Sequence, residues 1–261
     1  MTRDEQLRFL IGRLLDELPQ YRAQAAQFPA DAPAQRRLLR SLMNVRPPLP
    51  LDDGFLAVQD ALLSAETAAK GVVDPAALPP TGAPGVFLWQ GDITRLAADA
   101  IVNAANAALL GCFIPCHGCI DNAIHSAAGL QLRDECNRIM TAQGHEEPAG
   151  QAKLTGAYNL PAGRVLHTVG PIVRGAVTAR DRRELRSCYD ACLALAAAHG
   201  LRSVAFCCVS TGEFHFPNRE AAGIAVAAVR AFLRDHGGMR VIFNVFKDTD
   251  LAIYRELLGA D

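Results

Sequence analysis

Apolar residues recur every three or four positions through the first 75 residues, a pattern typical of amphipathic helices. The first such face consists of Leu7, Leu10, Ile11, Leu14, Leu15 and Leu18. A second face over Leu38–Met43 ends at the prolines of residues 46–50, and we expect a third helix over Phe55–Ala69. A stretch rich in Pro and Gly follows over residues 71–85. The pattern therefore predicts a helical N-terminal extension over residues 1–85.

The pattern changes at residue 86, where short apolar runs begin to alternate with amphipathic stretches. The runs predict buried strands at residues 86–89, 100–102, 165–169, 204–209 and 241–246. The stretches between them predict helices at residues 120–140, 182–199, 219–236 and 251–258. This alternation indicates an α/β layer fold with a largely parallel or mixed sheet over residues 86–261.

Composition narrows the classes of function. The 261 residues suffice for one full core plus an accessory segment. A formal net charge of -1 gives no overall attraction for a polyanion, which argues against nucleic acid as a partner. The sequence shows neither a signal peptide nor an apolar run of about 18 residues, so we expect no membrane segment. All eight cysteines follow residue 111, unlike a secreted disulfide framework, and a reducing cytoplasm is the expected location.

Two predicted strands end in residues that are too polar or too rich in glycine for a core. One ends in Asn103-Ala104-Ala105-Asn106, and the other continues through Ser210-Thr211-Gly212 into a predicted helix. Ligands of open α/β sheets collect at the carboxyl ends of the strands. A Ser-Thr-Gly loop before a helix can also direct several backbone N–H groups at one anion. Taken alone, this second segment fits a plain strand-to-helix turn with a capping Asn218 better.

The segment Gly111–His125 concentrates side chains that bind metals: Cys112, Cys116, His117 and Cys119. Thiolates and imidazole are ligands that Zn²⁺ prefers. The alternative is a set of small buried cysteines beside one capped histidine. Structural zinc sites take four ligands from two separated pairs, and no second C-x-x-C pair occurs here. Three ligands from one loop would leave a coordination position open, which indicates a catalytic site.

Several segments resemble macrodomain motifs in the order of that family: Gly91–Thr94, Asp99–Asn106, Ile124–Gly129, Tyr158–Pro161, Val165–Pro171 and Ser210–Gly212. The resemblance covers about residues 86–258 and implies the three-layer α/β/α macrodomain fold with a mixed central sheet. Ordinary macrodomain hydrolases carry a run of glycines where this chain has Cys112–Cys119. This departure, together with the helical extension, resembles the zinc-dependent macrodomains of microbes, which are protein-ADP-ribose hydrolases.

The resemblance implies a role for each matching residue. It implies that Cys112, His117 and Cys119 hold Zn²⁺, with Cys116 expected outside the metal site. It further implies that substrate is bound by Asp92, Ile93, Asn106, Ser210, Thr211, Gly212, Glu213, Phe214 and Phe246. Within this set we expect Asp92 and the Ile93 backbone to bind adenine, Phe246 to pack on it, Asn106 to bind the distal ribose, and the 210–216 loop to wrap the diphosphate. From the residues alone, Asp92 fits a turn cap equally well and Phe246 fits a core position. His125 is expected to be structural.

The expected function follows from these roles. Asp121, two residues after Cys119, is placed to act as a general base or to orient water, with Asn106 assisting; capping the first turn of a helix is a compatible role. We expect a zinc hydrolase that removes mono-ADP-ribose from modified proteins and releases ADP-ribose. One alternative is a non-catalytic ADP-ribose reader. Another is a zinc-stabilised adaptor, which would need a basic stripe and a closed four-ligand site that the sequence lacks.

Overall fold

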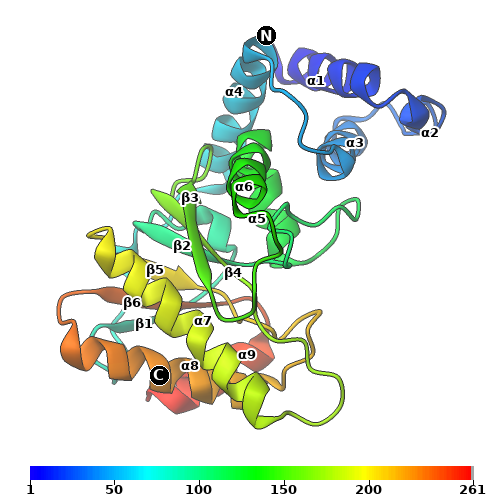
Figure 1. The fold of residues 1–261 in the computed structure, drawn as a ribbon. Helices are drawn as coiled ribbons and strands as arrows, with labels where there is room; N and C mark the ends of the chain where they lie inside the picture. Colours follow the sequence, from blue (N-terminus) through cyan, green and yellow to red (C-terminus); the bar gives the residue numbers. More distant parts are fainter. Residues whose placement is uncertain (260–261) are drawn as a thin grey trace.

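Four α-helices precede the first strand in the computed structural model, which describes residues 1–259 (Figure 1). They are α1 (Arg3–Glu17), α2 (Arg22–Ala25), α3 (Ala32–Val45) and α4 (Asp53–Lys70). Side-chain caps fix where three of them begin, because Thr2, Asp31 and Asp52 each accept a hydrogen bond from a first-turn N–H. The apolar faces of α1, α3 and α4 meet in a core of their own, to which Leu130 contributes. The predicted helices of the extension are confirmed.

The described residues form one six-stranded sheet with the order β1-β6-β5-β2-β4-β3. Its strands are β1 (Val86–Gln90), β2 (Ala100–Ala104), β3 (Ala152–Gly156), β4 (Arg164–Thr168), β5 (Ser203–Phe206) and β6 (Arg240–Val245). All neighbouring pairs are parallel except β3–β4, which is antiparallel. The carboxyl ends of β1, β6, β5, β2 and β4 therefore share one edge of the sheet.

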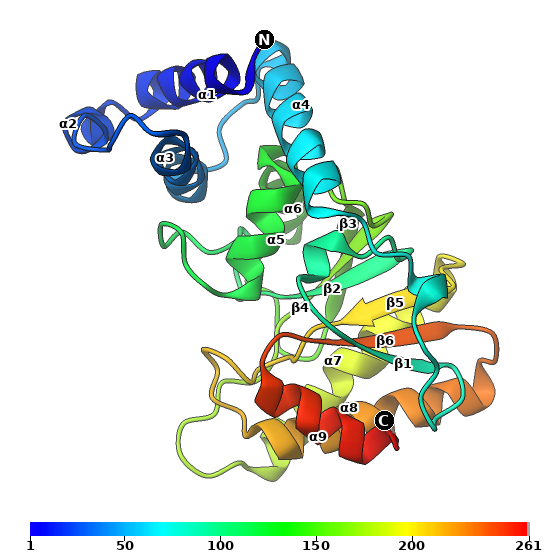
Figure 2. The ribbon, with the colours of Figure 1, turned by 180° about the vertical axis from the view of Figure 1, so that it is seen from behind.

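Helices cover both faces of this sheet (Figures 1 and 2). On one face lie α5 (Ile120–Ala128) and α6 (Leu130–Gln143), with α3 and α4 beyond them. On the other face lie α7 (Ala179–Ala198), α8 (Asn218–Asp235) and α9 (Asp248–Leu258). The expected three-layer α/β/α arrangement with a mixed sheet is confirmed. The first strand begins one residue after the proposed domain boundary at 85, and the division into two domains stays a prediction.

Three local expectations differ from the structure. The helix expected over residues 120–140 is divided at Gly129, which has φ +97° and lies so close to Gln59 that a Cβ atom would come within 2.6 Å of Nε2. The strand expected over 204–209 ends at Phe206, so Cys207 and Cys208 lie beyond it. Strand β3 was not predicted, because its short, half-buried sequence lacks an apolar run.

Within residues 1–259, no helix combines the length and the apolar character that a bilayer crossing requires.

Candidate functional site

The predicted site segments follow the carboxyl ends of the strands and so meet at one edge of the sheet. Asp92 follows β1, Phe246 follows β6, and the 207–217 loop follows β5. The 105–119 segment follows β2 and leads into α5. Because these strands are parallel, their following loops converge where α/β proteins bind ligands. The fold thus supplies the common location that the sequence analysis assumed.

The three predicted metal ligands come together in the 111–119 loop. One side-chain atom from each of Cys112, His117 and Cys119 lies within 4.8 Å of the other two, and all three residues are half-buried. The Cys119 residue also caps α5, and its Sγ accepts a hydrogen bond from the Asn122 N–H at 3.4 Å. Burial, opposed by this hydrogen bond, raises the pKa of the Cys119 thiol, and the neighbouring Cys112 adds to the rise. A bound metal ion would stabilise both thiols as thiolates.

The two ring nitrogens of His117 show whether a metal ion fits between these residues. Its Nδ1 atom is buried and has no hydrogen-bond partner among the described residues. Its Nε2 atom lies 3.7 Å from Glu213 Oε1, on the loop that follows β5. A buried imidazole nitrogen without a partner is costly, and a metal ion would satisfy it. A carboxylate near the other ring nitrogen is the outer contact that zinc-binding histidines commonly have. The donor set therefore fits a borderline-soft divalent cation such as Zn²⁺.

Cys116 lies in the same loop but points elsewhere. Its backbone is left-handed, with φ +52°, and its Sγ lies 3.3 Å from Ser41 Oγ on α3. The thiol is thus directed at the N-terminal helices rather than at the other two cysteines.

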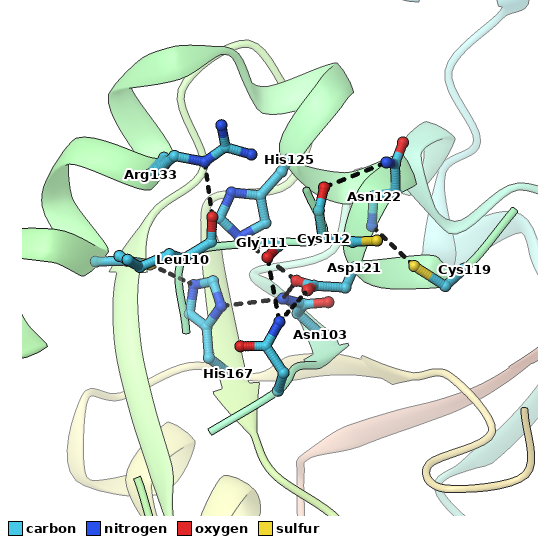
Figure 3. A network of polar contacts seen from close by, with 12 residues as sticks. Asn103, Leu110, Gly111, Cys112, Cys119, Asp121, Asn122, His125, Arg133 and His167 are labelled. Atoms are coloured by element: carbon cyan, nitrogen blue, oxygen red, sulfur yellow. Dashed lines mark hydrogen bonds and ion pairs between the residues drawn. The ribbon is translucent and has the colours of Figure 1, made fainter. Parts of the chain in front are cut away.

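Asp121 lies in the first turn of α5 and is buried, with 5% of its surface exposed. Its Oδ1 accepts a hydrogen bond from Asn103 Nδ2 at 2.8 Å, and its Oδ2 lies 3.4 Å from Asn106 Nδ2. Figure 3 follows this network from Asp121 through Asn103 to His167, whose Nδ1 lies 3.2 Å from Asn103 Nδ2. Burial raises the pKa of the Asp121 carboxyl to about 6, and the Asn103 hydrogen bond opposes that rise. Two amides thus fix the carboxylate in one orientation.

The side-chain amide of Asn106 already makes hydrogen bonds within the protein. Besides Asp121, its Nδ2 donates to the Gly111 carbonyl at 3.1 Å, and its Oδ1 accepts from the Ala108 N–H at 3.1 Å. The structure therefore unites the two predicted catalytic residues. A ribose hydroxyl could use only the second lone pair of Asn106 Oδ1, since both ends of the amide already have partners.

The loop after β5 has the backbone geometry of an anion site. Ser210 and His215 have positive φ values of 64° and 58°, and the Phe216 N–H closes the loop on the Ser210 carbonyl at 2.9 Å. The N–H groups of Gly212, Glu213 and Phe214 donate to no acceptor within the described residues. Consecutive free N–H groups in such a turn form a concave anion-binding surface. The Glu213 carboxylate would repel a diphosphate, so only its backbone suits the predicted role.

Gly170, which follows β4, fixes the other side of this loop. A Cβ atom at this position would lie 1.9 Å from Ser210 Oγ, so a larger residue would displace the loop. The Ser210 Oγ atom is buried and has no partner among the described residues.

The predicted adenine contacts lie at the β1 and β6 end of the same edge. Asp92 Oδ1 caps the following turn by accepting from the Thr94 N–H and Oγ1–H at 3.0 and 2.6 Å, so the turn-cap role is real. Its Oδ2 remains available, 3.8 Å from Lys70 Nζ. The Ile93 side chain is buried in the main core, which leaves only its backbone for a ligand. Phe246 is 77% exposed, so it is a surface aromatic and not a core residue.

Sequence reasoning assigned no individual role to four residues that organise the site: Asn103, Asn122, His167 and Arg40. Asn103 and His167 are buried polar residues within apolar strands, a local signal that could have marked them as functional. Asn122 immediately follows Asp121. Arg40 gave no signal, because its partners lie 77 and 82 positions away in the chain.

Comparison with known proteins agrees with this geometry. A family model described as "Macro domain" matches residues 102–225. A protein-ADP-ribose hydrolase of Treponema medium is 50% identical over 263 aligned positions, covering 99% of this chain and 100% of that protein. One from Staphylococcus aureus (strain MSSA476) is 49% identical, covering 86% of this chain and 85% of that protein. A solved Trypanosoma brucei macrodomain in complex with ADP-ribose is 32% identical with a TM-score of 0.65, covering 84% of this chain and 95% of that one. The chain belongs to the macrodomain family.

Proposed function

We propose that this chain is a hydrolase that binds the ADP-ribosyl group and removes mono-ADP-ribose from modified proteins. We further propose that it does so with one Zn²⁺ held by Cys112, His117 and Cys119. Relatives about 50% identical over nearly the whole chain are named protein-ADP-ribose hydrolases, which supports the activity. The observation that carries the proposal is the meeting of a Cys–His–Cys set, an oriented carboxylate and an anion-binding loop at one edge of the sheet.

The proposed binding follows the order of groups along this edge. The exposed Phe246 ring would stack on adenine, and the free oxygen of Asp92 would accept its amino group. The N–H groups of residues 212–214 would bind the diphosphate. The distal ribose would then lie between the 111–119 loop and Asp121. These contacts hold the sugar in one place, which itself lowers the barrier to reaction.

The proposed reaction adds water across the bond between C1 of the distal ribose and the protein side chain. The hydroxyl group goes to the sugar, and the proton goes to the leaving group on the side chain. Asp121 would accept the proton of the attacking water, with its carboxylate held in place by Asn103 and Asn106. When bound, Zn²⁺ supplies a Lewis acid beside the distal ribose.

A paired measurement of turnover and binding tests the proposal. We expect the zinc-loaded chain to release ADP-ribose from a mono-ADP-ribosylated protein. Removing the metal with a chelator should reduce this release by at least about 100-fold, because metal ions contribute several kcal/mol to such reactions, and added Zn²⁺ should restore it. ADP-ribose affinity, measured by calorimetry, is the control and should change much less.

Each outcome separates the candidate functions. Binding of ADP-ribose without any release, in the presence of Zn²⁺, would make the chain a reader. Full release by a metal-free preparation would remove zinc from the mechanism while leaving the hydrolase intact.

A further inference from the structure

The loop that carries the proposed zinc ligands makes few backbone hydrogen bonds of its own. Within residues 111–119 the described contacts include one such bond, from the His117 N–H to the Ile114 carbonyl at 3.2 Å. Gly111 and Cys116 have positive φ values of 81° and 52°, which departs from any regular element. Side chains from other elements must therefore fix the shape of this loop.

Asn122 of α5 makes the first set of these contacts and is fully buried. Its Nδ2 donates to the Ile114 carbonyl at 2.9 Å and lies 3.4 Å from the Cys112 carbonyl. Its backbone N–H donates to Cys119 Sγ. One residue thus contacts the chain at both cysteine ligands (Figure 3).

Arg40 of α3 makes the second set and comes from the N-terminal helices. Its Nε and Nη2 donate to Asn122 Oδ1 at 3.1 and 2.6 Å, which fixes the orientation of that amide. Its Nη2 also donates to the His117 carbonyl at 3.1 Å. Arg40 therefore contacts the third ligand residue directly and the other two through Asn122. Figures 1 and 2 show α3 beside α5, where these contacts form.

Asn44 lies one turn further along α3 and holds the middle of the loop. Its Oδ1 accepts from the Cys116 N–H at 2.9 Å, and its Nδ2 donates to Ser126 Oγ on α5 at 3.0 Å. Cys116 has the left-handed backbone, which a residue with a Cβ atom adopts only where its surroundings compensate. The hydrogen bond from the Cys116 N–H to Asn44 Oδ1 stabilises this backbone conformation, immediately before His117 in the chain.

We propose that Arg40 and Asn44 are positioning residues for the metal site, so that the N-terminal helices determine how tightly the chain holds Zn²⁺. This inference rests on the proposed zinc site. Side chains that orient metal ligands commonly contribute 10- to 100-fold to metal affinity in proteins, roughly the effect expected here.

The contacts of Arg40 and Asn44 are not what holds the N-terminal helices against the rest of the protein, because other hydrogen bonds join these helices to α6. Arg133 of α6 donates to the carbonyls of Met43 and Arg46. Gln59 of α4 accepts from the Leu130 N–H at 3.0 Å, and Leu130 enters the core of the N-terminal helices. Attachment should therefore survive the loss of the Arg40 side chain.

The test compares Arg40→Met with Arg37→Met in the full chain. Arg37 lies on the same helix, but its exposed side chain makes none of these contacts within the described residues. Competition with a chromophoric chelator would measure zinc affinity, and thermal unfolding of the metal-free proteins would measure stability. We expect Arg40→Met to weaken zinc binding by about 10- to 100-fold, with an unfolding midpoint close to that of Arg37→Met. Arg40→Lys, which keeps one donor, should recover part of the affinity.

Three outcomes would count against the proposal. Equal zinc affinity in wild type and Arg40→Met would overturn this inference alone. An equal loss in Arg40→Met and Arg37→Met would do the same. A wild-type chain that holds no zinc would overturn the proposed metal site and this inference with it. Should Arg40→Met fail to fold, Asn44→Ala provides the same test through the Cys116 contact.

Discussion

Two groups of cysteine and histidine side chains lie near Asp121, and in both the ligand atoms are within 4.8 Å of one another. The loop group consists of Cys112, His117 and Cys119, and the core group consists of His125, Cys136 and His167. The loop group is half-buried at the ligand-binding edge of the sheet, whereas every member of the core group is buried. Ligand type and mutual distance therefore do not show which of the two groups binds a metal ion. The surroundings of each group have to be compared.

The surroundings of the core group differ from those of the loop group. The His167 nitrogens already face partners, Asn103 Nδ2 at 3.2 Å and Thr155 Oγ1 at 2.9 Å. Burial raises the pKa of the Cys136 thiol to about 12 and does the same for Cys119 in the loop group, so thiol acidity does not distinguish the two groups. Burial lowers the pKa of His125 far below its usual value, and the His167 and Arg133 charges lower it further. The engaged His167 nitrogens and the nearby Arg133 guanidinium favour packing and the orientation of Asn103. Both ring nitrogens of His125 are buried without a partner among the described residues, as Nδ1 of His117 is in the loop group.

The comparison predicts its largest effect for single cysteine substitutions. Cys119→Ser should weaken zinc binding by more than about 100-fold, since the loss of a ligand exceeds the usual outer-contact effect, while serine still caps α5. Cys136→Ser should leave one zinc bound with unchanged affinity. Chelator competition measures both. Equal losses in the two variants would show that the core group also binds metal.

The next effect concerns Asp121, which lies between the two groups. Asp121→Asn removes the proposed proton acceptor but keeps its shape, so turnover should fall by about 100- to 10,000-fold. Affinity for ADP-ribose should change only a few-fold, and zinc binding should persist. Single-turnover kinetics and calorimetry measure these quantities. Asp134→Asn, a change of the same kind on α6, is the control. A parallel loss of turnover and affinity would assign Asp121 to binding only.

The third effect is a pH dependence of stability that comes from the core group. Burial lowers the pKa of His167 from 6.5 to about 4, so the unfolded chain binds a proton more readily than the folded one. The stabilisation is complete above pH 6.5 and is lost as the pH falls to 4, a decrease of about 3 kcal/mol in the free energy of unfolding. His125, also buried and neutral, acts in the same direction, and its neighbours His167 and Arg133 reinforce it.

Urea unfolding across this pH range, with and without Zn²⁺, measures the effect. His167→Gln should reduce the dependence because glutamine does not titrate there, and the remaining slope would come from His125. A slope that persists unchanged in His167→Gln would assign the proton uptake to other groups.

Local sequence was enough to predict most of the fold. The apolar runs identified five strands, since strands buried on both faces leave a continuous apolar signal. Strand β3 lies at the sheet edge with only Thr155 buried, and so it left no such signal. The division of the expected helix at Gly129 depends on the close approach of Gln59 from α4, which no local pattern encodes.

The candidate site was likewise predictable only in part. The grouping of Cys112, His117 and Cys119 and the position of Asp121 beside them were predictable, because these residues are near one another in the chain. The contacts of Arg40 were not, because they exist only once α3 packs against α5. Cys116 was left open by the sequence, and its direction is set by Ser41 and Asn44, also from α3.

The 3.7 Å approach of Glu213 to His117 joins the loop proposed to bind the diphosphate to the loop proposed to bind the metal. Any shift of the first loop on taking up a ligand alters the environment of the imidazole in the second. If both loops bind as proposed, thermodynamic reciprocity requires that nucleotide and metal change each other's dissociation constants by the same factor. A titration of either one thus reports on the other.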